Sequence, residues 1–138
     1  MGTVINLRQL ATQQNMYRLV IYTNGTYGQE DSAISINKRL AEELRKLKPT
    51  RRTMQLEKCF NRILDSLPEK SVIKDIDVMF NPAYRVDVIR ILVEANKRHP
   101  FSLVWPGRYD DNRLLYGEES LTDYKAYEIS DYDIVCVV

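Results

Sequence analysis

The sequence predicts an α/β protein in which a mostly parallel sheet of about five strands is flanked by helices. Short runs rich in β-branched and aromatic residues alternate with longer segments in which apolar residues recur at helical spacing, the pattern of successive βαβ units. The last run, residues 134–138, is apolar throughout, which is typical of a central strand covered on both faces. A chain of 138 residues with an apolar fraction of 44% fits a single domain, residues 1–138, with an ordinary core.

The first strand is predicted over residues 18–23 (RLVIYT), and the turn dipeptide Asn24-Gly25 ends it. Residues 33–37 (AISIN) alternate like a second short strand. They also fit the beginning of a helix, because apolar residues continue from there at helical spacing, and both interpretations stay open. These residues are Ile36, Leu40, Leu44 and Leu47.

Two helices follow this segment. The first is expected over residues 38–48 and ends at Pro49, and the second is expected over residues 53–67 and ends at Pro68. The second helix has an apolar face made of Leu56, Phe60, Ile63, Leu64 and Leu67. Both helices are therefore expected to pack one side against the core.

A further strand is expected over residues 72–80 (VIKDIDVMF), with Asp75 and Asp77 on the same face. Asn81 then fits the N-cap of the next helix and Pro82 its first position. The strand FSLVW, residues 101–105, follows that helix and lies between two prolines. The helix between the two strands has an apolar stripe of Val86, Ile89, Leu92 and Val93.

The N-terminal segment, residues 1–16, is predicted to be an extension or a helix, and it has no apolar run of the kind found in a secretory signal. No apolar run approaches the ~20 residues that a membrane helix needs. Cys59 and Cys136 lie in helix and strand patterns, so we expect both to be reduced core residues. These features predict a cytoplasmic protein that does not contact membranes.

Glycines are scarce after the first predicted strand, where an α/β protein with this order of strands and helices would bind a phosphate. A P-loop needs a glycine-rich turn at a helix N-terminus, a lysine for the phosphates and a Ser or Thr for Mg²⁺. After the first strand this chain has TNGTYGQEDS, in which Glu30 and Asp31 stand near where the motif requires Gly-Lys-Ser/Thr. Carboxylates there repel a triphosphate, so we expect a surface turn and no bound cofactor. The alternative is a divergent NTPase with an unusual loop over residues 24–32 and ATP and Mg²⁺ as its ligands.

Asp75 and Asp77 are the candidate metal ligands of that alternative. Two carboxylates on one face at the end of an apolar strand suit Mg²⁺ in an NTPase. Lys74 is adjacent and no histidine is near, so the competing interpretation is a partly exposed edge strand without a metal.

Charge is unevenly distributed along the chain, although the net charge is only +1. Residues 38–62 contain nine basic residues against three acidic ones, whereas residues 110–138 contain eight acidic residues against two basic ones. A charged helix is usually only solvated, but the basic segment also fits a small DNA-binding module. Its candidate contact residues are Arg45, Lys46, Lys48, Arg51 and Arg52.

Aromatic residues are concentrated in the acidic C-terminal third. Half-exposed amphipathic rings suit a protein interface and serve equally as ordinary packing. The candidate partner-binding residues are Trp105, Tyr109, Tyr116, Tyr124 and Tyr127. If they form an interface, alanine at Trp105, Tyr116 or Tyr124 weakens partner binding and leaves the fold intact.

The same segment resembles the C-terminal signature of BrxF, the small P-loop protein of type 3 BREX bacteriophage-exclusion systems. That signature has W-P-G after an apolar strand, then R-L-x-Y, an acidic stretch and E-Y-x-x-Y. The matching residues are Trp105-Pro106-Gly107, Arg113-Leu114-Leu115-Tyr116 and Asp123-Tyr124-Lys125-Ala126-Tyr127. Phe80-Asn81-Pro82-Ala83 with Asp87 and Leu92, and the segment 36–52, resemble earlier parts of the family pattern, so the likeness covers roughly residues 33–138.

The resemblance implies a reduced P-loop NTPase-like core of the RecA/AAA type, but the motif G-x-x-x-x-G-K-[ST] is absent. The family's magnesium-binding aspartate falls on Lys74, and a slip of one residue would restore it at Asp75. With both halves of the nucleotide site degraded, we expect a non-catalytic accessory or scaffold subunit of a bacterial anti-phage defence system. Its partners would be other defence proteins, with DNA reached directly or through them.

Overall fold

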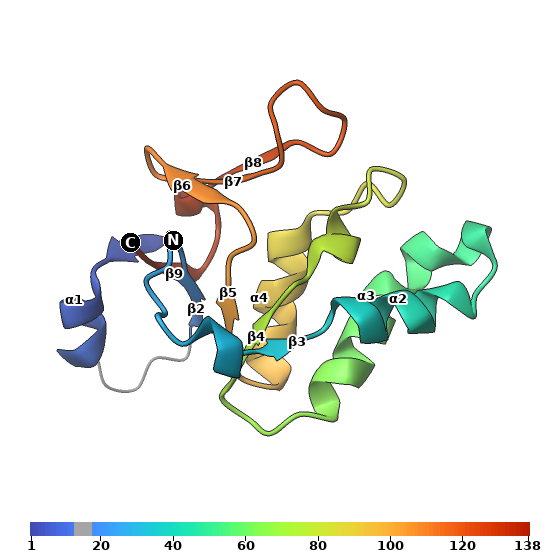
Figure 1. The fold of residues 1–138 in the computed structure, drawn as a ribbon, viewed down its shortest axis with the longest axis horizontal. Coiled ribbons are helices and arrows are strands. Elements are labelled where there is room, and N and C mark those ends of the chain that lie inside the picture. Colours follow the sequence, from blue (N-terminus) through green and yellow to red (C-terminus); the bar gives the residue numbers. More distant parts are fainter. Residues whose placement is uncertain (13–17) are drawn as a thin grey trace.

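The computed structural model describes residues 1–12 and 18–138, and Figure 1 shows how their helices and strands are arranged. Within these residues, six parallel strands form one sheet in the order β1-β9-β2-β5-β4-β3, and three antiparallel strands form a second sheet in the order β6-β7-β8. The predicted α/β class, with a parallel sheet flanked by helices, is confirmed. The parallel sheet has one strand more than expected, and the small antiparallel sheet was not expected.

Three of the expected strands lie side by side in the middle of the parallel sheet. They are β2 (Leu19–Tyr22), β5 (Phe101–Val104) and β9 (Ile134–Val137). Every residue of β9 is buried, and the strand pairs with β1 (Thr3–Ile5) on one side and with β2 on the other. Its continuous apolar run therefore indicated a central strand correctly.

The segment 33–37 contains parts of both predicted structures. β3 (Ile34–Ser35) is a two-residue edge strand, and α2 (Asn37–Arg45) begins two residues after it. The next helix, α3 (Pro49–Asp65), begins four residues earlier than expected, because Pro49 stands at its first position. Proline suits that position, since its missing N–H would have had no partner within the helix. The same proline thus separates the two helices and starts the second.

The strand expected over residues 72–80 is wrong in its second half. β4 (Ser71–Lys74) stops at Lys74, because Asp75 takes a left-handed backbone conformation with φ of 56°. The 3₁₀ helix η2 (Asp77–Phe80) follows, so Asp75 and Asp77 do not share a strand face.

The N-cap expected at Asn81 is also wrong. Residues 81–84 form a turn, in which the backbone N–H of Tyr84 donates to the carbonyl oxygen of Asn81. The helix α4 (Val88–Arg98) is capped by the Asp87 side chain, which accepts a hydrogen bond from the backbone N–H of Arg90.

The core is divided by the parallel sheet into a large part and a small one. The large part joins the sheet to α2, α3 and α4, and it contains the stripe residues Ile89 and Leu92. The small part lies on the other face, where Leu10 of α1 (Leu7–Thr12) packs near Ile5 and Val135. The N-terminal segment thus supplies an edge strand and a helix, and residues 13–16 of the predicted extension lie outside the described part of the chain.

Both cysteines are free and buried, as expected. Cys59 lies in α3 and Cys136 in β9, and both belong to the large part of the core. Among the described residues, no helix combines the length and apolar character needed to cross a bilayer.

The antiparallel sheet consists of β6 (Arg108–Asp110), β7 (Arg113–Tyr116) and β8 (Lys125–Glu128). Asp111 and Asn112, which connect β6 to β7, have φ values of 49° and 62°. Positive φ at both central residues is the requirement of a type I′ hairpin turn, and Asp and Asn tolerate it better than most residues. The tyrosine-rich segment therefore contains a small sheet, with a loop over residues 117–124 between β7 and β8.

Candidate functional site at the carboxyl ends of the parallel strands

A hollow of about 270 Å³ lies where β2, β4 and β5 end. Its walls are the ends of the three strands, the turn after β2 and the W-P-G segment after β5. The lining residues are Tyr22, Asn24, Gly25, Thr26, Tyr27, Glu30, Lys74, Asp75, Val104, Trp105, Pro106 and Gly107. Open parallel sheets bind ligands at this edge, so the hollow is the candidate functional site.

The turn after β2 is held against the sheet by hydrogen bonds to one carbonyl group. The backbone N–H and the Oγ1 hydroxyl of Thr23 both donate to the carbonyl oxygen of Val137, at 3.0 Å and 2.8 Å. The Thr26 hydroxyl donates to the same oxygen at 3.3 Å. The rings of Tyr22 and Tyr27 meet at a centroid distance of 4.9 Å. These contacts fasten the turn to the end of β9 through Thr23 and Thr26.

No α-helix lies between this turn and β3, a stretch that the structure describes in full. The chain forms only the three-residue 3₁₀ helix η1 (Glu30–Ser32) before β3. Glu30 lies in the lining of the hollow and Asp31 is exposed beside it. A phosphate bound here would meet the carboxylates of Glu30 and Asp75, with Lys74 as the cation among the described lining residues. It would meet no helix N-terminus, so the hollow lacks the features of a phosphate-binding cradle.

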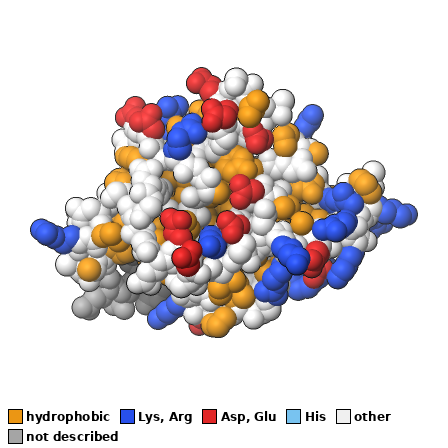
Figure 2. Space-filling view, in the orientation of Figure 1, with side chains coloured by type: hydrophobic (Ala, Val, Ile, Leu, Met, Phe, Trp, Pro, Cys, Tyr) orange, Lys and Arg blue, Asp and Glu red, His pale blue; other side chains and the backbone are white. Residues whose placement is uncertain are grey.

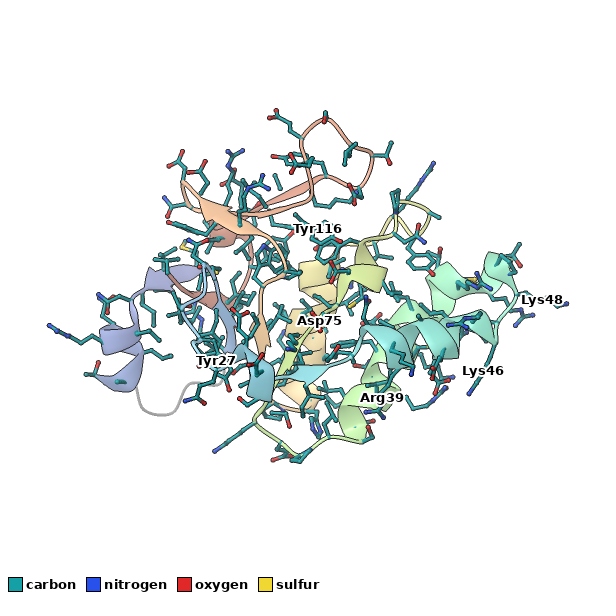
Figure 3. The ribbon with its side chains drawn as sticks, in the orientation of Figure 1. Tyr27, Arg39, Lys46, Lys48, Asp75 and Tyr116 are labelled. Atoms are coloured by element: carbon teal, nitrogen blue, oxygen red, sulfur yellow. The ribbon has the colours of Figure 1, made fainter. Side chains whose placement is uncertain are left out.

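The two predicted metal ligands lie in different environments. Asp75, labelled in Figure 3, is exposed one residue beyond the end of β4 and lines the hollow. Asp77 belongs to η2, and its Oδ2 accepts a hydrogen bond of 2.9 Å from the Tyr116 hydroxyl. No group of three or more His, Cys, Asp or Glu side chains that could hold a metal ion occurs among the described residues.

Two of the predicted partner-binding residues are buried. Trp105 is 4% exposed, and its indole Nε1–H donates to the carbonyl oxygen of Leu115 at 2.9 Å. Its ring also meets the rings of Phe80 and Tyr127 edge to face. Tyr127 is 7% exposed, and burial, followed by the charge of Asp87, raises the pKa of its hydroxyl to about 12. These two residues belong to the core and not to a surface.

Tyr116 faces the body of the molecule, where its ring stacks on Phe80 with a centroid distance of 3.9 Å and an interplanar angle of 9°. Burial and the hydrogen bond to Asp77 raise the pKa of Tyr116. A second tyrosine, Tyr132, donates to Oδ2 of Asp87 at 2.8 Å, and the pKa of Tyr132 is raised by burial and by that carboxylate. The two hydroxyl groups thus connect the C-terminal third to η2 and to the N-cap of α4.

Tyr109 and Tyr124 are the predicted partner-binding residues that line a surface hollow. This second hollow, of about 460 Å³, lies over the antiparallel sheet and is bordered by charged side chains. Its remaining lining residues are Arg108, Asp110, Arg113, Leu115 and Glu119.

The predicted DNA-contacting residues lie together at the turn between α2 and α3, far from the first hollow. Figure 3 labels Lys46 and Lys48 at that end of the molecule. Arg45, Lys46, Lys48 and Arg51 are exposed, whereas Arg52 is half-buried and its Nε donates to the carbonyl oxygen of Leu47 at 3.3 Å.

Sequence reasoning missed the aromatic and proline lining of the first hollow, namely Tyr22, Tyr27 and Pro106. A usable signal was present, because the residues that follow each parallel strand meet at one edge of the sheet. Gly107 completes that edge, since a Cβ atom there would overlap the carbonyl group of Leu115. Comparison with known proteins found no matching family, no matching curated protein and no matching solved structure.

Proposed function

We propose that this chain is a non-catalytic accessory or scaffold subunit of a bacterial anti-phage defence system, with a P-loop-derived core that does not bind nucleotide. The observation that carries the proposal is the connection between β2 and β3. It holds one 3₁₀ turn with Glu30 and Asp31 in place of a glycine-rich loop, a lysine and a helix. Such a connection keeps the strands in place without offering a site for phosphate.

The strand order supports the P-loop origin of the core. When β1 and the three antiparallel strands are left out and the remaining parallel strands are numbered along the chain, the order β9-β2-β5-β4-β3 becomes 5-1-4-3-2, which is the order of a RecA-like sheet. The resemblance to BrxF implies this type of core, and the defence role rests on that resemblance.

The positions of Lys74 and Asp75 support the loss of metal chemistry. The last residue of β4 is Lys74, and Asp75 lies one residue beyond the strand in a left-handed conformation. An ammonium group beside this carboxylate competes with a divalent cation for it. Glu30 is the second carboxylate among the described lining residues, and two carboxylates leave most positions around Mg²⁺ to water.

Calorimetric titration with ATP and Mg²⁺ tests the proposal directly. We expect no saturable heat up to millimolar nucleotide and no shift in the thermal midpoint, since a ligand that binds the native state must raise it. Micromolar binding that is lost in an Asp75→Asn variant would favour the divergent NTPase instead.

The scaffold role requires a contact surface, and the second hollow, with Tyr109 and Tyr124, is the candidate. A tagged chain expressed with its neighbouring genes should retain its partners less well after Tyr124→Ala. Tyr27→Ala is the matched control, because Tyr27 is also half-buried but lies in the first hollow. Equal retention of partners by the wild type and the Tyr124→Ala variant would remove this surface from consideration.

A further inference from the structure

A group of exposed cations covers the α2–α3 hairpin. We call Arg45, Lys46, Lys48, Arg51 and Lys58 the basic hairpin surface. Each of these side chains is exposed, and within the described residues none makes an ion pair or a hydrogen bond. Figure 2 shows the lysine and arginine side chains gathered at this end of the molecule. The surface thus presents positive charge that the fold itself does not neutralise.

Neighbouring cations on the same helices have structural partners. Arg62 pairs with Glu43 at 3.4 Å, and Arg39 donates to the Ser66 hydroxyl at 2.7 Å. Arg52 is engaged with the backbone of the turn. The helix α3 has no acidic residue in its first turn. Lys38 is also exposed and without a side-chain partner among the described residues, but it lies at the start of α2, at the opposite end of that helix from the turn. The unpaired cations at the turn and along α3 include Lys58 and leave out Arg52.

The apolar and aromatic residues of the hairpin indicate whether it suits a lipid surface, single-stranded nucleic acid or double-stranded DNA. The apolar faces of both helices are used in the core, through Leu40 and Leu44 of α2 and Leu56 and Phe60 of α3. Met54, 80% exposed, is the large hydrophobic side chain that remains outside. One methionine gives little area for insertion into a lipid surface. Phe60, the aromatic residue of the two helices, is fully buried, so no ring is available for stacking on unpaired bases.

We propose that the basic hairpin surface binds the phosphate backbone of double-stranded DNA without reading the base sequence. The cations come from the end of α2, the turn and the part of α3 from its first turn to its middle. Figure 3 labels two of them, Lys46 and Lys48, at the projecting end of the hairpin. Their interaction with closely spaced phosphates releases counterions, which makes affinity depend steeply on salt. This contact does not involve the hollow at the carboxyl ends of the strands and is independent of nucleotide binding.

Fluorescence anisotropy with a labelled DNA duplex tests the proposal. Neutralising roughly four phosphates predicts a loss of about 10²-fold in affinity between 50 and 200 mM salt. The triple variant Lys46→Gln, Lys48→Gln, Arg51→Gln should reduce the slope of log affinity against log salt by about 2.7. Since all three side chains are exposed, the variant should keep the wild-type circular dichroism spectrum and thermal midpoint.

The matched control is Arg8→Gln, Arg90→Gln, Lys125→Gln, which removes the same charge from α1, α4 and β8. It should keep the wild-type salt slope. The proposal is overturned if the control weakens binding as much as the triple variant, because net charge would then be the cause. Failure to bind the duplex at 50 mM salt, tighter binding to single strands of equal length, or tighter binding to phosphatidylserine vesicles would each overturn it as well.

Discussion

At the residue scale, Trp105 shows how the environment changes the meaning of an aromatic side chain. In the sequence it is the last residue of the predicted strand 101–105, and its place among the aromatic residues of the acidic C-terminal third made it a candidate for binding a partner. In the fold its ring is enclosed by Phe80 and Tyr127, and its N–H satisfies a buried carbonyl group. A buried side chain of this kind stabilises the fold. Any effect of its substitution on partner binding is therefore a consequence of the lost stability.

Trp105→Ala should lower the free energy of unfolding by about 3–5 kcal/mol, because it leaves a large cavity. Trp105→Phe should cost less, about 1–3 kcal/mol, mainly because the Leu115 carbonyl loses its donor. Urea denaturation measures both values. Tyr124→Phe is the control and should change the unfolding free energy by less than about 0.5 kcal/mol. A fully stable Trp105→Ala variant would contradict this account and restore Trp105 as a surface residue.

The buried hydroxyl of Tyr127 predicts a loss of stability at high pH. Its pKa is about 12 in the fold, whereas an unfolded tyrosine has a pKa of about 10. The folded state holds the proton more tightly, so stability is complete below pH ~10 and decreases as pH rises toward 12. The Tyr127→Phe variant should show a smaller decrease over this interval, by about 2 kcal/mol, and little change at pH 8. Identical pH profiles for the two proteins would show that Tyr127 does not titrate differently in the fold.

At the scale of elements, the strands that were predicted correctly are those that are apolar and bounded by turn residues. β2, β5 and β9 combine both signals, and each was predicted to within two residues of its ends. The end of β4 was missed because alternation of apolar and polar residues continues through Asp75 and Asp77, while the backbone turns at Asp75. The hollow was missed because it depends on which strand ends become neighbours, and strand order is a tertiary property.

The turn after β4 can be tested by comparing glycine with alanine at Asp75 and at Asp77, because the more stable of the two substitutions is expected to differ between these positions. Asp75 has a positive φ, so Asp75→Gly should be more stable than Asp75→Ala by about 1 kcal/mol. Asp77 lies in a 3₁₀ helix, where Asp77→Ala should instead be more stable than Asp77→Gly by about 0.5–1 kcal/mol. Thermal unfolding of the four variants makes both comparisons. An equal preference for alanine at both positions would mean that β4 continues through Asp75 in solution.

At the scale of the whole molecule, the antiparallel sheet is joined to the helices and the parallel sheet by side chains of its own. Leu114 and Tyr127 enter the large part of the core, and Tyr116 stacks on Phe80. Together with the Tyr116–Asp77 and Tyr132–Asp87 hydrogen bonds, these contacts position the second hollow relative to the parallel sheet. A partner bound at the second hollow would therefore contact a surface that is fixed to the core and not a separate flap.

If the core is one cooperative unit, the two buried cysteines should become reactive together. Cys59 lies in α3 and Cys136 in β9, and burial raises the pKa of both thiols, that of Cys136 to about 12. Low thiolate content and burial should keep both unreactive toward Ellman's reagent in the native protein. Increasing urea should expose both thiols at the same midpoint. Each thiol can be followed alone, Cys136 in a Cys59→Ala variant and Cys59 in a Cys136→Ala variant. The labelling midpoint of each variant is compared with the urea unfolding curve of that same variant. Labelling of Cys59 at a lower urea concentration than global unfolding would instead show that the α2–α3 hairpin opens separately. A DNA-binding surface on that hairpin would then be less rigid than the sheet beneath it.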